Sequence, residues 1–169
     1  MRPIHEIVNE LWEKQRVIID LPDNALQATL EIKHGFIDIM LKNENAGEYI
    51  GFITIEHPQS GTYYIHKDPK VIHHPDFQIN NGTGLAVQEQ FKNMGYESAL
   101  LSLGIGTAQK HYLAADSKAA FAVIMPDKGE TNWKRLYEPF GFLKSDERAL
   151  PKYVERSTVK ELKITLRAD

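Results

Sequence analysis

The start of the chain carries apolar side chains at helical spacing. The apolar positions of segment 4–15 are Ile4, Ile7, Val8, Leu11 and Trp12. They recur every three or four residues, which is the period of one face of an α-helix. The pattern therefore predicts an amphipathic helix, and the LPDNA that follows, which is rich in turn-forming residues, ends it.

Apolar and polar residues alternate in the next part of the chain. The alternation covers 26–33 and, more strongly, 35–42, whereas 48–57 is apolar on both faces. Alternation predicts a strand with one buried face, and a strand that is apolar on both faces is typical of the centre of a sheet. With a short further strand at 62–67, this part of the sequence predicts antiparallel strands, of which 48–57 is central.

The second half of the sequence predicts the remaining elements. Residues 68–84 include prolines, glycines and polar residues, which indicates a loop leading into a strand that includes 85–89. Helical spacing predicts a helix from Ser98 to about Tyr112, and 119–125 has the continuous apolar character of a buried strand. A short helix in NWKRLYEPF and two strands in KYVERSTVKELKITLR complete the pattern.

The order helix, strands, helix, strand, helix, strands predicts a mixed α/β (α+β) fold around one sheet. The chain of 169 residues has the length of one domain and is long enough to bury a core. Because no repeat, low-complexity tract or long linker interrupts it, we expect a single domain over 1–169.

Composition and charge exclude several classes of function. The sequence has no cysteine, so disulfides, a thiolate nucleophile and thiolate metal ligands are excluded. Its net charge of -3 provides no basic surface for nucleic-acid phosphates. The charged N-terminal segment has no apolar core of the signal-peptide type, and no apolar run has the length of a membrane span. We therefore expect a cytoplasmic protein with no nucleic-acid or membrane partner.

The segment 85–101, LAVQEQFKNMGYESALL, combines an apolar strand, a short loop and the start of a helix. The first backbone N–H groups of a helix have no acceptor within it and, with the helix dipole, form a site for an anion such as pyrophosphate. Gly95 permits a close turn there, and Lys92 adds a positive charge. An ordinary strand–helix junction that contains a glycine is the alternative interpretation.

This segment resembles the acetyl-coenzyme A motif of the GNAT superfamily of N-acetyltransferases, in which a strand leads through Q/R-x-x-G-x-G/A into a helix. Lys92 occupies the Q/R position, Gly95 the first glycine and Glu97 the final G/A position, and a Leu-Leu pair follows in register. A second segment, RLYEPFGF (135–142), is similar to the later helix of that family. The two segments follow each other in the order of the family, with a predicted buried strand between them.

The resemblance implies a splayed mixed sheet flanked by helices, with acetyl-coenzyme A as co-substrate and a small-molecule or peptide amine as acceptor. It implies that amides around 95–98 hold the pyrophosphate, and that pantetheine lies between the strand ending near Val87 and the strand 119–125. The cofactor-binding residues implied in this way are Leu85, Ala86, Val87, Lys92, Asn93, Met94, Gly95, Tyr96, Glu97 and Ser98.

Glu97 departs from the family pattern and has two interpretations. A carboxylate in the first turn of a helix without ligand is stabilising by about 0.3–1 kcal/mol. With a pyrophosphate bound, the same charge is repulsive. Glu97 therefore either points outward, or it indicates a non-catalytic GNAT-fold binding or structural module that has lost acetyl-coenzyme A binding.

Two catalytic roles are implied by the resemblance. The family commonly uses direct attack of the amine on the thioester, so no enzyme nucleophile is required. Tyr137 matches the position of the family's general acid, and a phenol can protonate the leaving thiolate. Packing is its alternative role. Glu56, at the end of the 48–57 strand, and Glu89 are candidates for the general base, and each is also explained as a solvated carboxylate.

Other patterns have simpler explanations. GIG at 104–106 lies inside the predicted helix and is typical of close helix packing rather than of a phosphate loop. The histidines His57, His66, His73 and His74 lack the spacing of a metal site, so no metal is predicted. The alternating charges of the last strand predict an exposed sheet edge, through which two copies of the chain could pair.

Overall fold

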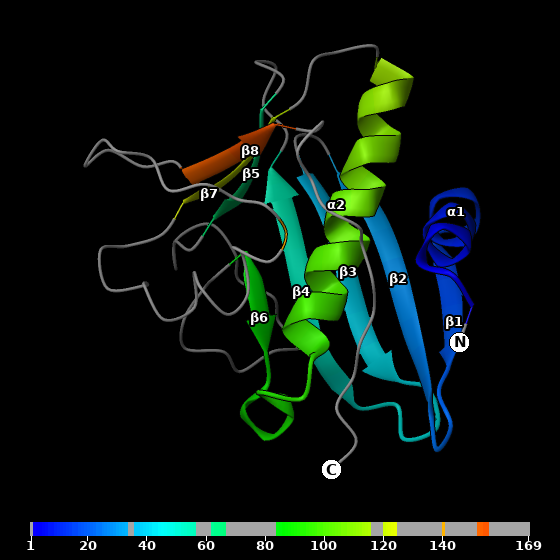
Figure 1. Cartoon of the computed structure of the whole chain (residues 1–169). Helices are drawn as coiled ribbons and strands as arrows, with labels where there is room; N and C mark the ends of the chain where they lie inside the picture. Colours follow the sequence, from blue (N-terminus) through cyan, green and yellow to red (C-terminus); the bar gives the residue numbers. More distant parts are fainter. Residues whose placement is uncertain are drawn as a thin grey trace.

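The structure, a computed structural model, describes residues 2–33, 36–56, 62–66, 84–115, 120–124, 140 and 152–155 (Figure 1). The elements of these residues in chain order are α1 (Ile4–Lys14), β1 (Arg16–Asp20), β2 (Ala25–Lys33), β3 (Phe36–Asn43), β4 (Tyr49–Glu56), β5 (Thr62–His66), β6 (Leu85–Val87), the 3₁₀ helix η1 (Glu89–Phe91), α2 (Tyr96–Ala115), β7 (Ala120–Ile124) and β8 (Lys152–Glu155). This is a mixed α+β fold, as predicted.

A single residue, Gln15, separates helix α1 from strand β1. Gln15 adopts a left-handed conformation (φ 61°), and its N–H donates to the Leu11 carbonyl at 2.8 Å. β1 begins at the next residue. Apolar spacing predicted the helix, but no pattern in the sequence predicted β1, because the strand follows the helix without any turn-forming residue between them.

Strands β1 to β4 form an antiparallel meander. Each strand pairs with the next along its length. In the turn before β4, the Asn43 side-chain oxygen accepts the N–H groups of Asn45 and Ala46, and Gly47 adopts φ +66°. The antiparallel strands and the central position of 48–57 were therefore predicted correctly.

One edge of β4 is shared by two short strands. β5 pairs antiparallel with the end of β4 (Glu56 opposite Tyr64), and β6 pairs antiparallel with 51–53. β5 and β6 consequently run in the same direction. β7 pairs parallel with β5, and β8 pairs antiparallel with β7. The sheet is therefore mixed, and in the described part of the chain β1 and β8 lie at its two ends.

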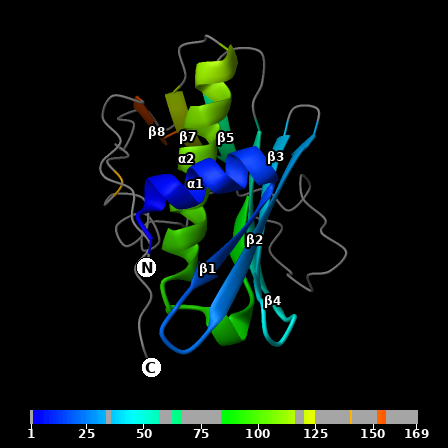
Figure 2. The same cartoon turned by 90° about the vertical axis from the view of Figure 1, so that its right-hand side faces the viewer.

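Both α-helices cover the same face of the sheet, as Figure 2 shows. α2 is buried on all sides from 99 to 108, because it packs against α1 and against β3, β4 and β6. Gly104 lies against the side chains of Ile53 and Ile55, which confirms the packing explanation of GIG. The helix begins at Tyr96, two residues before the predicted Ser98.

The buried residues between the sheet and the helices form one large cluster, which includes Leu11, Ile39, Ile53, Leu100 and Phe140. A small second cluster on the opposite face contains Phe52 and Ala86, with Met40 and Tyr49 partly buried against them. Neither of the two described α-helices has the length and apolar character needed to cross a membrane.

Several predictions lie outside the described residues. These are the loop at 68–83, the short helix in NWKRLYEPF with Tyr137, the second strand of the tail, and the histidines His57, His73 and His74. The single domain over 1–169 also stays a prediction.

Candidate functional site

The predicted phosphate segment begins with β6, which is anchored to β4 along one edge. The Thr54 N–H donates to the Gly84 carbonyl at 2.6 Å, and the Gln88 N–H donates to the Ile50 carbonyl at 2.8 Å. Hydrogen-bonded pairs alternate along an antiparallel ladder. The backbone polar groups of Leu85 and Val87 therefore point away from β4. Within the described residues, no strand pairs with that edge of β6.

The side chains of β6 divide between the two faces of the sheet. Val87 is buried in the main core and Leu85 packs against it, while Ala86 contacts Phe52 on the opposite face. A Cβ at Gly51 would lie 2.4 Å from the Ala86 carbonyl oxygen, so the two strands approach closely because this position is glycine. The three side chains fix the position of the strand, and the backbone polar groups of Leu85 and Val87 are the ones that point away from β4.

The loop after β6 is held to the β3–β4 turn. The Gln88 side chain donates to the Tyr49 carbonyl at 2.6 Å, and the Gln90 side chain donates to Glu48 at 3.1 Å. The predicted strand over 85–89 is wrong at its end: it stops at Val87, and Glu89 starts the 3₁₀ helix. The strand stops because the Gln88 contacts turn the chain away from the sheet.

Two residues with positive φ lead into α2. Asn93 has φ 63° and Gly95 has φ 97°, conformations that asparagine and glycine tolerate. The Gly95 carbonyl accepts the Ala99 N–H at 3.0 Å, so Gly95 closes the first turn of the helix. The N–H groups of Tyr96, Glu97 and Ser98 are then the first-turn donors that have no acceptor within the helix. Gly95 thus makes the close turn into α2 that its residue type predicts, and its part in a phosphate site stays a prediction.

Aromatic packing fixes the side of the loop next to the core. The rings of Phe91 and Tyr96 meet edge to face with centroids 5.8 Å apart, and Met94 is partly buried against the core. Burial raises the pKa of the Tyr96 phenol. Tyr96 is therefore neutral at physiological pH and serves as a packing residue.

The charges of the loop partly cancel. The Lys92 ammonium lies 2.7 Å from the Glu89 carboxylate, and both side chains are exposed. Exposed ion pairs of this kind contribute little to stability and are readily exchanged for another partner. Glu97 is half-buried in the first turn of α2. Residues 88–98 therefore carry one ammonium and two carboxylates, and Lys92 has a carboxylate partner before any ligand binds.

The predicted catalytic residues are not brought together by the described part of the chain. Glu56 ends β4 opposite Tyr64 of β5, and Glu89 is exposed on the loop beyond β6. Tyr137 lies outside the described residues. Phe140, which belongs to the same RLYEPFGF segment, is buried in the main core with Leu100 of α2. Across the described residues, no group of three or more histidine, aspartate or glutamate side chains is arranged to hold a metal ion.

Sequence reasoning missed Gln88 and the outward edge of β6. Gln88 contacts Tyr49, which lies 39 positions earlier in the chain, and no local pattern encodes such a contact. Which backbone groups of β6 point outward depends on the alternation of hydrogen-bonded pairs along the ladder with β4, and this alternation is known only once the strand register is known. A glutamine directly after an apolar strand was the only signal in the sequence.

Comparison of the chain with protein-family models, with curated proteins and with solved structures gave no significant match. Any function must therefore be argued from the residues and from the geometry around β6 and α2.

Proposed function

We propose that this protein is an N-acetyltransferase that transfers an acetyl group from acetyl-coenzyme A to an amine. The acceptor is a small molecule or a peptide. The absence of cysteine fits a reducing compartment, so the proposal assigns the enzyme to the cytoplasm.

One observation carries the proposal: β6 and β7, which α2 connects, run in the same direction but do not pair with each other. α2 connects β6 to β7, and both strands run in the same direction, yet β7 pairs with β5 and β6 pairs with β4. In open α/β sheets, ligands bind beyond the carboxyl ends of parallel strands, and β5, β6 and β7 all run in one direction in this mixed sheet. The outward edge of β6 and the first turn of α2 lie at that end, which is the arrangement that a long thioester with a pyrophosphate requires.

The residues present offer partners for the pantetheine amides and for the pyrophosphate of acetyl-coenzyme A. The outward backbone N–H and C=O of Val87 match the amides of pantetheine. The first-turn N–H groups of Tyr96, Glu97 and Ser98 match the pyrophosphate, and the dipole of the 20-residue helix favours its negative charge. Lys92 would exchange the Glu89 carboxylate for a phosphate.

The reaction balances without an enzyme nucleophile. The amine nitrogen forms a bond to the acetyl carbonyl carbon, the carbon–sulfur bond breaks, and the thiolate takes a proton. In this proposal Tyr137 donates that proton, and Glu56 accepts the proton that the amine loses. Glu56 is preferred over Glu89, because Glu56 lies where β4 meets β5, whereas Glu89 holds Lys92.

The balance of charge favours a second candidate, a non-catalytic module with the same fold. Residues 88–98 carry two carboxylates and one ammonium, which disfavours a pyrophosphate. In this second candidate Glu97 stabilises the start of α2 and Glu89 stabilises the loop, and the outward edge of β6 binds another protein rather than pantetheine.

Thermal unfolding of the purified chain with and without acetyl-coenzyme A separates the two candidates. Ligand at 100 times its Kd stabilises the folded state by about 2.7 kcal/mol, which raises the Tm by about 5–10 °C for a chain of this size. We expect such a shift, and we expect coenzyme A to compete for it. A Tm that does not respond would contradict the first candidate and support the second.

Lys92→Ala tests whether the shift reports the predicted site. We expect the variant to lose most of the Tm shift, because it removes the positive charge next to the pyrophosphate. Lys14→Ala is the matched control: Lys14 is also exposed and also pairs with a glutamate, Glu10, but it lies on α1. Equal shifts in Lys92→Ala and in the control would show that acetyl-coenzyme A binds elsewhere.

A further inference from the structure

Strand β1 lies at one end of the sheet among the described residues, and the ladder between β1 and β2 defines which of its backbone groups face outward. Leu21 and Asn24 exchange both backbone hydrogen bonds across the turn, at 2.7 and 3.4 Å. At the other end of the ladder, the Leu30 N–H donates to the Gln15 carbonyl at 2.9 Å. Both Leu21–Asn24 and Gln15–Leu30 are therefore hydrogen-bonded pairs. Between them, hydrogen-bonded and non-hydrogen-bonded pairs alternate along the ladder.

The outward positions of β1 follow from this alternation. Val17 and Ile19 direct their backbone groups toward β2, and their side chains are buried in the core. Arg16, Ile18 and Asp20 direct their N–H and C=O groups away from the sheet. The side chains of Arg16 and Asp20 are exposed. Arg16 forms an ion pair with the Glu44 carboxylate at 3.4 Å, an exposed contact that a second copy would exchange for Asp20.

These three residues are complementary to themselves in an antiparallel arrangement. If two copies of β1 pair about a two-fold axis through Ile18, each Ile18 lies opposite the other, and Arg16 of each copy lies opposite Asp20 of its partner. All three pairs are then hydrogen-bonded pairs, and two of them place opposite charges directly across from each other, which is favourable. A two-fold arrangement is also the commonest symmetry of protein dimers.

Arg2 occupies the centre of this edge. Its guanidinium donates to the Ile18 carbonyl at 3.1 Å through one nitrogen and to the Glu10 carboxylate at 2.5 Å through another. Lys14 lies 3.6 Å from the other oxygen of Glu10. The Ile18 carbonyl is the group that a second strand would need at the two-fold axis, so Arg2 and a second copy compete for it.

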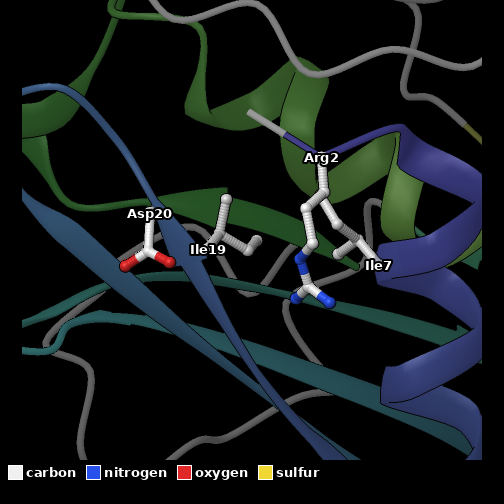
Figure 3. A pocket seen from close by; sticks show the side chains of 4 residues that line it. All are labelled: Arg2, Ile7, Ile19 and Asp20. Carbon is white, nitrogen blue, oxygen red and sulfur yellow. The ribbon is translucent and has the colours of Figure 1, made fainter.

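Arg2 is able to leave without disturbing the core. A hollow of about 230 Å³ beside the strand is lined by Arg2, Ile7, Ile19 and Asp20. Figure 3 shows the Arg2 side chain extending between Ile7 and Ile19. Its side chain is 42% exposed, so its withdrawal breaks its polar contacts and uncovers only part of the surface of Ile7 and Ile19.

We propose that the outer edge of β1 is a pairing surface for a second copy of this chain, and that Arg2 controls it by holding the Ile18 carbonyl. Charge complementarity between Arg16 and Asp20 selects a second copy over an unrelated strand. While Arg2 is in place the edge is protected, as natural sheet edges usually are. Withdrawal of Arg2 opens the edge and permits a dimer with one continuous sheet.

Sedimentation of the full chain over a range of concentrations tests this proposal. Arg2→Ala should strengthen self-association by about tenfold or more, the factor that corresponds to one hydrogen bond to a charged group. Glu10→Gln should act in the same direction, because it releases Arg2 without changing the edge. Lys14→Ala, which leaves the Arg2 contacts intact, is the control and should associate as the unaltered chain does.

Two additional variants test the predicted register in the Arg2→Ala background. Ile18→Pro removes the outward N–H and leaves every N–H that donates to β2, and proline is tolerated at a sheet edge. It should therefore abolish the dimer while leaving β1 paired with β2. Asp20→Arg places like charges opposite each other and should weaken the dimer, and adding Arg16→Asp should restore it.

Two results would overturn the proposal. The first is an Arg2→Ala and a Glu10→Gln variant that both stay monomeric at every concentration at which the chain is soluble. The second is self-association that Ile18→Pro and the charge exchange do not change, since it would then occur through another surface.

Discussion

At the scale of single residues, Glu97 decides between the two candidate functions. It is half-buried at the second position of α2, where a carboxylate stabilises the free helix and repels a bound pyrophosphate. We expect Glu97→Gly to tighten acetyl-coenzyme A binding by about tenfold, because it removes a like charge close to the phosphates. Isothermal titration of both proteins with acetyl-coenzyme A measures the effect.

Glu97→Ala separates charge from backbone freedom. Glycine destabilises a helix by about 1 kcal/mol relative to alanine, so Glu97→Gly should also unfold more easily. If the charge is what matters, both variants bind more tightly, and only the glycine variant loses stability. An affinity that neither variant changes would show that the Glu97 carboxylate points away from the ligand.

The lowered pKa of Glu10 leads us to expect a specific dependence of the folding stability on pH. Its pKa is lowered, first by the hydrogen bond from Arg2 and then by the charges of Arg2 and Lys14, which outweigh the desolvation that raises it. A lowered pKa in the folded state stabilises the protein above the ordinary value of 4.5, and the contribution is lost as the pH falls through the folded pKa.

Denaturant unfolding of the unaltered chain and of Glu10→Gln measures this contribution. Well above the ordinary pKa of 4.5 the variant should be the less stable of the two, and the difference should shrink as the pH falls through the lowered folded pKa and Glu10 becomes protonated. The effect should be small, because the pair is exposed to solvent and screened by salt. A difference that stays constant with pH would mean that Glu10 acts through packing.

At the scale of elements, the contact between β4 and β6 depends on Gly51. A Cβ there would lie 2.4 Å from the Ala86 backbone oxygen, which cannot move unless β6 moves. We expect Gly51→Ala to lower the free energy of unfolding by about 1–3 kcal/mol. Because β6 leads directly into the loop before α2, the variant should also weaken acetyl-coenzyme A binding.

Gly104→Ala is the matched control for this prediction. Its Cβ would also come close to other atoms, at 2.7 Å from Ile53 Cδ1 and 3.0 Å from Ile55 Cδ1, but these are the ends of side chains that can rotate. Alanine also favours the helix by about 1 kcal/mol over glycine, which offsets part of the crowding. Chemical denaturation should therefore show a smaller loss for Gly104→Ala; the opposite order would contradict the proposed role of Gly51.

The elements divide into those that local sequence encodes and those that it does not. The strands at β2, β3 and β4 were predictable because their burial alternates or is continuous, and the helices because apolar spacing is local. β1 was not predictable, because Gln15 joins it to α1 and no turn-forming residue lies between the two elements. The end of β6 was not, because the contact between Gln88 and Tyr49 sets it from a distant part of the chain.

The candidate site divides in the same way. The glycine that opens α2 and the carboxylate in its first turn were predictable, because a short segment encodes both. The ion pair of Lys92 with Glu89 and the outward edge of β6 required the register of the sheet and the course of the loop. Local sequence thus identifies a possible ligand segment, whereas the competing contacts of its residues come only from the fold.

At the scale of the whole molecule, protection from solvent should decrease from the centre of the sheet toward β1. α2 is fully buried from 99 to 108 and covers β3 and β4, whereas β1 has a neighbouring strand on one edge only in the described sheet. Amide hydrogen exchange follows local opening, which is rarest where burial is greatest. The slowest amides are therefore expected in α2, β3 and β4.

Within β1, the same reasoning predicts an alternation that tests the ladder itself. The N–H groups of Val17 and Ile19 donate to β2 and should exchange slowly, whereas that of Ile18 points outward and should exchange fast. Amide exchange measured by NMR resolves these neighbours. Similar rates at all three would contradict the register from which the pairing edge is inferred. In a dimer of Arg2→Ala, the Ile18 amide should become protected while Val17 and Ile19 change little, because only the outward groups gain a partner.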